Sequence, residues 1–155
     1  KQVRTQVEIP LLRKDFIVDE YQIYQSKLYG ADCILLIVSA LTDNQLIEYK
    51  SIAEELSLDV LVEVHNKQEL ERILTMNFSL IGINNRNLST FEVSLETTRD
   101  LSRQSGEATL VSESGIRNKK DIEEILSYGV LNFLVGESFM RAEDPGNELK
   151  RLFFA

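Results

Sequence analysis

Charged and polar side chains follow several apolar runs of this sequence at the point where each run ends. They are Lys14 and Asp15, Glu63 and His65, Asn84 and Arg86, and Glu113 and Ser114. A single charged residue in such a place is usually a solvated strand end. A recurring set predicts a shared site, because the carboxyl ends of parallel strands meet at one edge of a sheet. An amine, carboxylates and an amide brought together could carry general acid–base chemistry.

Two glycine-bearing turns that follow the last two apolar runs are typical of phosphate binding. They are Ser112–Ile116 and Gly136–Ser138. Both expose backbone N–H groups, and the first leads into a helix near Asn118 whose N-terminus carries partial positive charge. In TIM barrels the phosphate site is commonly built from the loops after strands seven and eight. If that rule holds, these runs are strands seven and eight, and the missing pair lies at the N-terminus.

Other reactive residue types do not predict a site. His65 is the only histidine, which excludes a multi-histidine metal site, and with no partner carboxylate apparent it is interpreted as a structural strand-end residue. Cys33 starts an apolar run and is interpreted as a small buried hydrophobe. Gly82–Asn84 lacks the spacing of a dinucleotide fingerprint, so a nicotinamide cofactor is not expected. The cluster Arg117–Lys120 is interpreted as a solvated helix start.

Six β-rich runs would position the polar residues. They are 9–16, 32–38, 59–65, 79–84, 108–113 and 132–136. Each run is nearly continuously apolar, whereas a strand with one wet face would alternate, so the runs predict a parallel sheet covered by helices. The segments between them show helical apolar spacing and resemble capping boxes at their starts, namely Asp19 with Gln22, Thr42 with Gln45, and Asn66 with Glu69.

The spacing of the runs predicts a single α/β domain over residues 1–155. The runs begin roughly 20 to 30 residues apart, close to the length of a βαβ unit, and no long linker separates them. This spacing indicates six βα units. A TIM (βα)8 barrel has eight units and usually takes about 250 residues, so either the sheet is open or about a quarter of a barrel is absent.

Composition and net charge argue against some classes of binding partner and favour one cellular compartment. The chain has 155 residues, 43% hydrophobic and 27% charged, as in one core-forming domain. Its net charge of −8 argues against nucleic-acid and anionic-membrane partners, but leaves room for a local basic pocket. The single cysteine and the lack of a secretory h-region favour the cytoplasm, and no stretch approaches the ~20 apolar residues that cross a bilayer. The first residue is not Met, so a fragment or processed product is expected.

Segments spread over the chain match one family in the order that this family has them. They are Pro10–Ile17 (PLLRKDFI), Gly30–Asp32 with Leu35–Ile37, Leu61–His65 (LVEVH), Gly82–Arg86 (GINNR), Ser112–Ile116 (SESGI), and Leu134–Ser138 (LVGES) with Met140 and Arg141. Together they resemble indole-3-glycerol-phosphate synthase. The resemblance implies a TIM (βα)8 barrel of tryptophan biosynthesis, of which this chain supplies strands three to eight.

The resemblance also implies an activity. That family closes the indole ring of 1-(2-carboxyphenylamino)-1-deoxyribulose 5-phosphate, releases CO2 and water, and uses neither a metal nor an organic cofactor. By the same resemblance Lys14 is the general acid that protonates the ketone oxygen, Glu63 is its acidic partner, and Asn84 orients that partner. A buried lysine can serve in this way if its pKa, about 10.4 when free, is lowered towards neutrality. We therefore expect a lowered pKa for Lys14.

The residues that would hold the phosphorylated substrate are implied in the same way. Arg86 would fix the acidic residues or bind the substrate carboxylate through two hydrogen bonds. Glu113 and Ser114 would line the sugar side. The phosphate would lie on the backbone amides of Gly115, Gly136 and Glu137. The anthranilate ring would lie among Phe16, Leu35 and Leu134, for which plain core positions are an equal interpretation.

The family's first two strands have no counterpart in this sequence. The first of them carries a Glu, a Lys and a Ser-Pro segment that supply a second acid–base pair and part of the phosphate site, whereas residues 1–7 resemble the end of the second helix. The 155 residues alone are therefore expected to be inactive and to self-associate through open sheet edges. Two alternatives remain open: another phosphate-binding barrel enzyme, such as phosphoribosylanthranilate isomerase, and a noncatalytic folded fragment.

Overall fold

Six parallel strands form one sheet in sequential order. A computed structural model describes residues 1–154, and each strand is hydrogen-bonded to the next along the chain. The strands are β1 (Leu12–Arg13), β2 (Cys33–Ile37), β3 (Asp59–Val64), β4 (Leu80–Asn84), β5 (Thr109–Glu113) and β6 (Asn132–Leu134). The predicted parallel sheet is confirmed, although β1 is much shorter than the predicted run 9–16.

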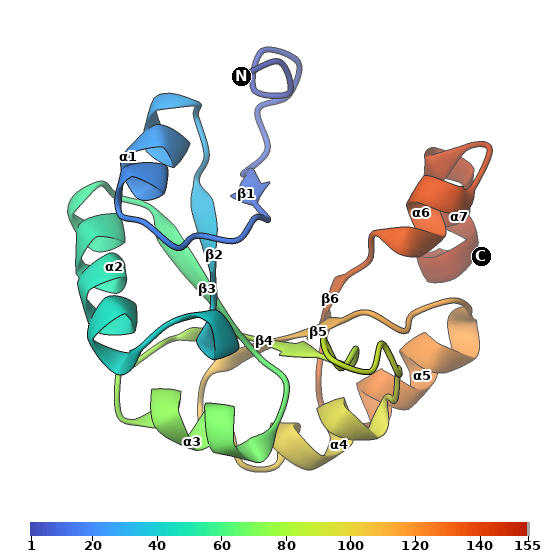
Figure 1. The fold of residues 1–155 in the computed structure, drawn as a ribbon. Helices are drawn as coiled ribbons and strands as arrows, with labels where there is room; N and C mark the ends of the chain where they lie inside the picture. Colours follow the sequence, from blue (N-terminus) through green and yellow to red (C-terminus); the bar gives the residue numbers. More distant parts are fainter. Residues whose placement is uncertain (155) are drawn as a thin grey trace.

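Helices follow the strands and cover the outer side of the curled sheet (Figure 1). They are α1 (Tyr21–Leu28), α2 (Asp43–Glu55), α3 (Lys67–Leu74), α4 (Glu96–Ser102), α5 (Lys119–Ser127), α6 (Glu137–Arg141) and α7 (Pro145–Phe153), with a 3-10 turn η1 (Val38–Ala40) after β2. In Figure 1, β1 and the α6–α7 pair lie at the two ends of the arc. None of the helices within residues 1–154 is long and apolar enough to cross a membrane.

The outer strands of the sheet are short. β1 pairs with β2 through Leu12↔Cys33 and Arg13↔Ile34, and β6 pairs with β5 over three residues. Directly before β1, the Leu11 N–H donates to the Asp32 side chain at 2.7 Å, and the Leu11 carbonyl accepts from the backbone N–H groups of Asp32 and Cys33. Within the described residues, each outer strand therefore has one paired edge and one open edge.

Alternation along the strands sorts the apolar side chains into two layers. In β2, Ile34 and Leu36 belong to the large core beneath the helices, whereas Leu35 packs with Leu61 of β3 in a small inner cluster. The next residue of β3 on the inner side is Glu63, because successive side chains of a strand point to opposite faces. The alternation that fills the inner layer therefore also places a carboxylate at its upper end.

The starts of the helices follow two of the three predicted caps closely. Thr42 Oγ1 accepts from the Gln45 N–H, and Gln45 Oε1 accepts from the Thr42 N–H, as in a capping box. Asn66 Oδ1 caps α3 by accepting from the Glu69 N–H. The third helix start differs, because α1 begins at Tyr21, whose N–H donates to the side chain of Asp19 two residues before it. The Asn66 cap fixes the first turn of α3 beside the end of β3.

Candidate active site

Lys14 lies between two buried carboxylates at the carboxyl ends of the strands. Its Nζ is 3.0 Å from Glu63 Oε2 and 3.1 Å from Glu113 Oε2. Lys14 directly follows β1, whereas the two glutamates come from the ends of β3 and β5. The Lys14 side chain is 42% exposed, but those of Glu63 and Glu113 are only 2% and 1% exposed. The fold thus brings one accessible amine against two carboxylates from distant parts of the chain.

Glu63 is held on both of its oxygens. Oε2 accepts from Lys14, and Oε1 accepts from Asn84 Nδ2 at 3.0 Å. Asn84 is itself oriented, because its Oδ1 accepts from the Arg86 N–H at 3.0 Å. The structure therefore brings Lys14, Glu63 and Asn84 together as a contiguous group.

Glu113 has a different environment. Within residues 1–154 neither of its carboxylate oxygens accepts a hydrogen bond, and its close charged contact is Lys14. Room for the carboxylate comes from Gly82 in β4, since a Cβ at that position would overlap Glu113 Oε1. The glycine of the Gly82–Asn84 segment thus admits a buried carboxylate to the inner side of the sheet.

The two carboxylates have pKa values on opposite sides of the ordinary 4.5. Burial alone would raise the pKa of Glu63, but the close contact with His65, the hydrogen bond from Asn84 and the charge of Lys14 lower it to about 2. Burial and the neighbouring charge of Glu63 raise the pKa of Glu113 to about 7, although Lys14 opposes this. Near neutral pH Glu63 is therefore ionised, whereas Glu113 can gain or lose a proton.

The expected lowering of the Lys14 pKa is wrong for this arrangement. Burial acts to lower it, but the charges of Glu113 and Glu63 outweigh burial and raise the pKa above its ordinary 10.5. The side chain is only partly buried, so loss of hydration is incomplete, while two carboxylates lie within ion-pair distance. Lys14 is an ammonium at neutral pH.

The interpretation of His65 as a residue without a partner carboxylate is also wrong. His65 Nε2 lies 3.1 Å from Glu63 Oε1, and its Nδ1 lies 3.0 Å from Glu69 Oε2. The sequence carried a signal for both contacts: Glu63 is two residues earlier on the same strand, and Glu69 belongs to the capping pair at the start of α3. Within residues 1–154, no group of three or more His, Cys, Asp or Glu side chains is arranged to hold a metal.

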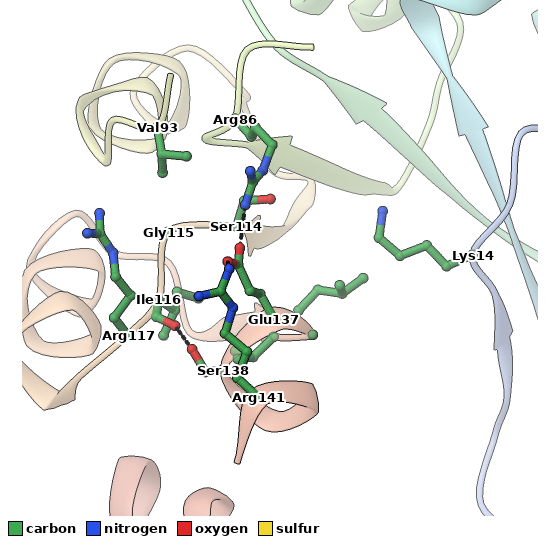
Figure 2. A pocket seen from close by; sticks show the side chains of 13 residues that line it. Lys14, Arg86, Val93, Ser114, Gly115, Ile116, Arg117, Glu137, Ser138 and Arg141 are labelled. Atoms are coloured by element: carbon green, nitrogen blue, oxygen red, sulfur yellow. Dashed lines mark hydrogen bonds and ion pairs between the residues drawn. The ribbon is translucent and has the colours of Figure 1, made fainter. Parts of the chain in front are cut away.

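A cavity of about 740 Å³ opens beside Lys14 (Figure 2). It is lined by Lys14, Arg86, Val93, Ser114, Gly115, Ile116, Arg117, Leu134, Val135, Gly136, Glu137, Ser138 and Arg141. In Figure 2, Lys14 stands at one side and Arg117 at the opposite side. The lining contains four basic side chains and one carboxylate, in a chain whose net charge is −8. The cavity is suited to an anionic ligand.

The turn after β5 is shaped by a close approach of the loop that follows β4. Gly115 has a φ of +79°, and a Cβ there would lie 2.7 Å from Val93 Cγ1. Val93 is placed by an isolated antiparallel bridge with Arg86. The turns after β5 and β6 are also tied together, because Ser138 Oγ donates to the Ile116 carbonyl at 2.5 Å (Figure 2). Both predicted glycine turns therefore border one cavity.

Arg86 pairs with Glu137 and not with the carboxylates beside Lys14. Arg86 Nη2 lies 2.5 Å from Glu137 Oε2, and Arg141 Nη2 lies 2.8 Å from Glu137 Oε1 (Figure 2). Glu137 was expected to contribute its backbone amide, and its side chain in addition bridges two arginines. An anionic ligand that displaced the Glu137 side chain could bind the guanidinium groups of both Arg86 and Arg141.

Two of the residues expected around the aromatic ring do not line this cavity. Leu35 is 1% exposed and lies in the inner cluster, so the core interpretation holds for it. Phe16 is 57% exposed and lies outside the lining, whereas Leu134 belongs to it. Arg117 is exposed just before α5, as expected of a solvated helix start, and in addition it lines the cavity. Val93 and Arg141 were missed as cavity residues, although Arg141 stands one helical turn after Glu137.

Comparison with known proteins identifies the family. The family model described as indole-3-glycerol phosphate synthase matches residues 1–152. The chain belongs to this family. The match extends over nearly all of the chain, so the indole-3-glycerol-phosphate synthase resemblance drawn from the motifs is confirmed.

Solved structures at low sequence identity share the fold. A point mutant of FabK from Thermotoga maritima has a TM-score of 0.74 at 12% identity, over 96% of this chain and 52% of that chain. For 3-hexulose-6-phosphate synthase the TM-score is 0.76 at 15% identity, over 98% and 75%. For KGPDC from Streptococcus mutans it is 0.69 at 15% identity, over 98% and 77%. The chain thus spans about half the length of FabK. The architecture is a partial TIM barrel.

Proposed function

We propose that these residues supply the ring-closing acid and the phosphate pocket of an indole-3-glycerol-phosphate synthase. The reaction joins the carboxylate-bearing aromatic carbon of 1-(2-carboxyphenylamino)-1-deoxyribulose 5-phosphate to its ketone carbon, and then releases CO2 and water. The observation that carries the proposal is Lys14, which lies between Glu63 and Glu113 and lines a cationic cavity. Family membership supports the reaction class, a carboxy-lyase of tryptophan biosynthesis.

Lys14 is the proposed general acid. Its ammonium gives a proton to the ketone oxygen as the new carbon–carbon bond forms, so the oxygen leaves this step as a hydroxyl. Because its pKa is raised, the proton moves only when the oxygen has gained most of a negative charge. Glu113, with a pKa of about 7 and an oxygen 3.1 Å from Nζ, is placed to return a proton to Lys14.

The anionic groups of the substrate match the charge of the cavity. We assign the phosphate to the turns that begin at Gly115 and Gly136, with the amides of Gly115, Gly136 and Glu137 as its ligands. Ser114 would border the sugar and Leu134 the ring. Arg86 would exchange Glu137 for the substrate carboxylate, which preserves a charged hydrogen bond on the guanidinium. The basic lining of the cavity supports this orientation.

The proposal requires no metal or organic cofactor. Three changes balance without an added oxidant or reductant: proton transfer by Lys14, loss of CO2 that restores the aromatic ring, and loss of the new hydroxyl as water together with a proton of the neighbouring methylene carbon. We place the protein in the cytoplasm, which the single cysteine, Cys33, and the biosynthetic family support. The family's first-strand acid–base pair is outside this sequence, so we expect turnover from a complete barrel.

Replacement of Lys14 by Met tests the proposal. In the intact protein that carries these residues, turnover followed by the fluorescence of the indole product should fall by roughly 10²- to 10⁴-fold, with KM little changed. Lys67→Met is the matched control, since Lys67 is 62% exposed on α3 and pairs with Glu71 there.

Two results would count against the proposal. Near-full turnover of Lys14→Met would show that another residue donates the proton. A wild-type protein that does not close the ring, but isomerises phosphoribosylanthranilate, would favour the alternative barrel enzyme.

A further inference from the structure

Resting on the proposed function, we propose that His65 is a positioning residue that holds Glu63 towards Lys14, and that Glu69 holds His65. Neither His65 nor Glu69 lines the cavity, so both act through Glu63 and not on the substrate. The three side chains form a row that runs from the first turn of α3 to Lys14.

Each step of the row is a close contact between named atoms. Glu69 Oε2 lies 3.0 Å from His65 Nδ1, and His65 Nε2 lies 3.1 Å from Glu63 Oε1. The other oxygen of Glu63 lies 3.0 Å from Lys14 Nζ. The His65 side chain is only 8% exposed. Because its two nitrogens contact different carboxylates, rotation of the ring would break both contacts at once.

Glu69 is fixed independently of the imidazole. Its Oε2 also accepts from the His65 N–H at 2.8 Å, and its Oε1 accepts from Asn66 Nδ2 at 2.7 Å. Its own N–H donates to Asn66 Oδ1 at 3.0 Å, which is the contact that caps α3. The cap therefore immobilises the Glu69 carboxylate, which orients His65. The start of α3 in this way helps to fix His65 beside Glu63.

The charges around the row favour a protonated His65. The ionisable groups that face it are Glu69 from α3, Glu63 from β3 and, beyond Glu63, Lys14 and Glu113. With a neutral imidazole, Lys14 would be the one cation in this group of three carboxyl groups. Burial alone would lower the pKa of His65, but contacts with Glu63 and Glu69 raise it to about 9. His65 is therefore an imidazolium at neutral pH, and both its nitrogens can donate.

The two oxygens of Glu63 therefore have different partners. Oε1 faces His65 and accepts from Asn84, which leaves Oε2 to Lys14. Loss of the His65 charge would raise the pKa of Glu63 and loosen the carboxylate. Because its pKa is raised, His65 loses its proton only as the pH rises through about 9. We therefore expect the positioning of Glu63 to fail above that pH.

The contact can be measured directly, because His65 is the only histidine in the 155 residues. NMR titration of its Hε1 proton in this chain should give a pKa of about 9. Glu69→Gln should move the value towards the ordinary 6.5. Glu71→Gln is the matched control, because Glu71 lies on the same helix, is 59% exposed and pairs with Lys67. A wild-type pKa near 6.5, or one that Glu69→Gln leaves unmoved, would overturn the proposal.

Turnover of the intact protein separates positioning from a purely structural role. Glu69→Gln and His65→Asn should lower kcat by up to about 100-fold with KM little changed, and Glu69→Gln should shift the alkaline limb of the pH profile to lower pH. His65→Gln, whose longer amide can reach Glu63, should recover part of the loss. Wild-type kcat in Glu69→Gln despite a lowered His65 pKa would overturn the positioning role. A wild type without ring-closing turnover would instead refute the proposed function, while the titration still decides the contact.

Discussion

Lys14 contacts two carboxylates whose protonation differs because their surroundings differ. Glu63 is contacted by Asn84, His65 and Lys14, and these contacts lower its pKa to about 2. Glu113 is buried without a hydrogen bond within the described residues, and its pKa rises to about 7. Two carboxyl groups whose pKa values differ in this way can have separate roles, one as a fixed charge and the other as a proton donor and acceptor. A lysine with a raised pKa can then act as an acid and be reprotonated by its neighbour.

The raised pKa of Glu113 predicts a dependence of stability on pH. A carboxyl group with a folded pKa near 7 binds more protons folded than unfolded above pH 4.5, so stability falls as the pH rises towards 7. Between pH 5 and 6.5 the free energy of unfolding should drop by on the order of 1–2 kcal/mol in the wild type and stay flat in Glu113→Gln. Urea unfolding at several pH values measures this slope.

The chosen pH window separates Glu113 from its neighbours. Glu63, with a folded pKa of about 2, changes charge below pH 4.5, and His65, with a folded pKa of about 9, changes charge above pH 6.5. Glu107→Gln, at an exposed position before β5, should keep the wild-type slope. Parallel slopes for the wild type and Glu113→Gln would show that Glu113 is ionised throughout.

The convergence of Lys14, Glu63 and Asn84 could be predicted from the sequence, because each follows an apolar run and parallel strands end at one edge. The direction of the Lys14 pKa could not, since it depends on two distances near 3 Å and on partial exposure. The contact of His65 with Glu63 could also be predicted, from the alternation of side chains along the strand. Its contact with Glu69 needed the helix start to be placed in space.

The turn after β5 is the element in which one atom matters most. Gly115→Ala should weaken phosphate binding at least 10-fold, because the residue has a φ of +79° and a new Cβ would meet Val93 Cγ1 at 2.7 Å. Titration of inorganic phosphate, followed by calorimetry, measures the loss. Gly106→Ala is the matched control, since Gly106 has a φ of +63° but nothing within 4 Å of a new Cβ. Equal loss of affinity in both variants would attribute the effect to backbone strain and not to the contact with Val93.

Elements flanked by strands on both sides follow the sequence prediction better than those at the ends. The predicted run 79–84 contains β4 (Leu80–Asn84) almost residue for residue, because both of its edges are paired. The run 9–16 yields only Leu12–Arg13, because Pro10 offers no N–H and the Leu11 N–H is taken by Asp32. Apolar periodicity reports burial, whereas strand length also depends on the partner.

At the scale of the whole molecule, charge is separated by position. The chain carries −8 overall, yet the cavity at the end of the sheet has four basic side chains and one carboxylate. Such a local field attracts a small dianion while the rest of the surface repels polyanions. Composition predicted the second property, but the first required the loop after β4, the turn after β5 and helix α6 to bring Arg86, Arg117 and Arg141 to one place.

The open edges of the arc predict how residues 1–155 behave alone. β1 and β6 each pair along one edge, and unpaired strand edges template association, so sedimentation velocity should show self-association that grows with concentration, without indole-forming turnover. Leu131, 70% exposed directly before β6, is the test position: Leu131→Lys should weaken association because a charge beside an edge strand opposes pairing. Leu28→Lys, at a 74% exposed leucine of α1 away from that edge, should leave association unchanged. A concentration-independent monomer with ring-closing turnover would refute the prediction and show that the arc closes on itself.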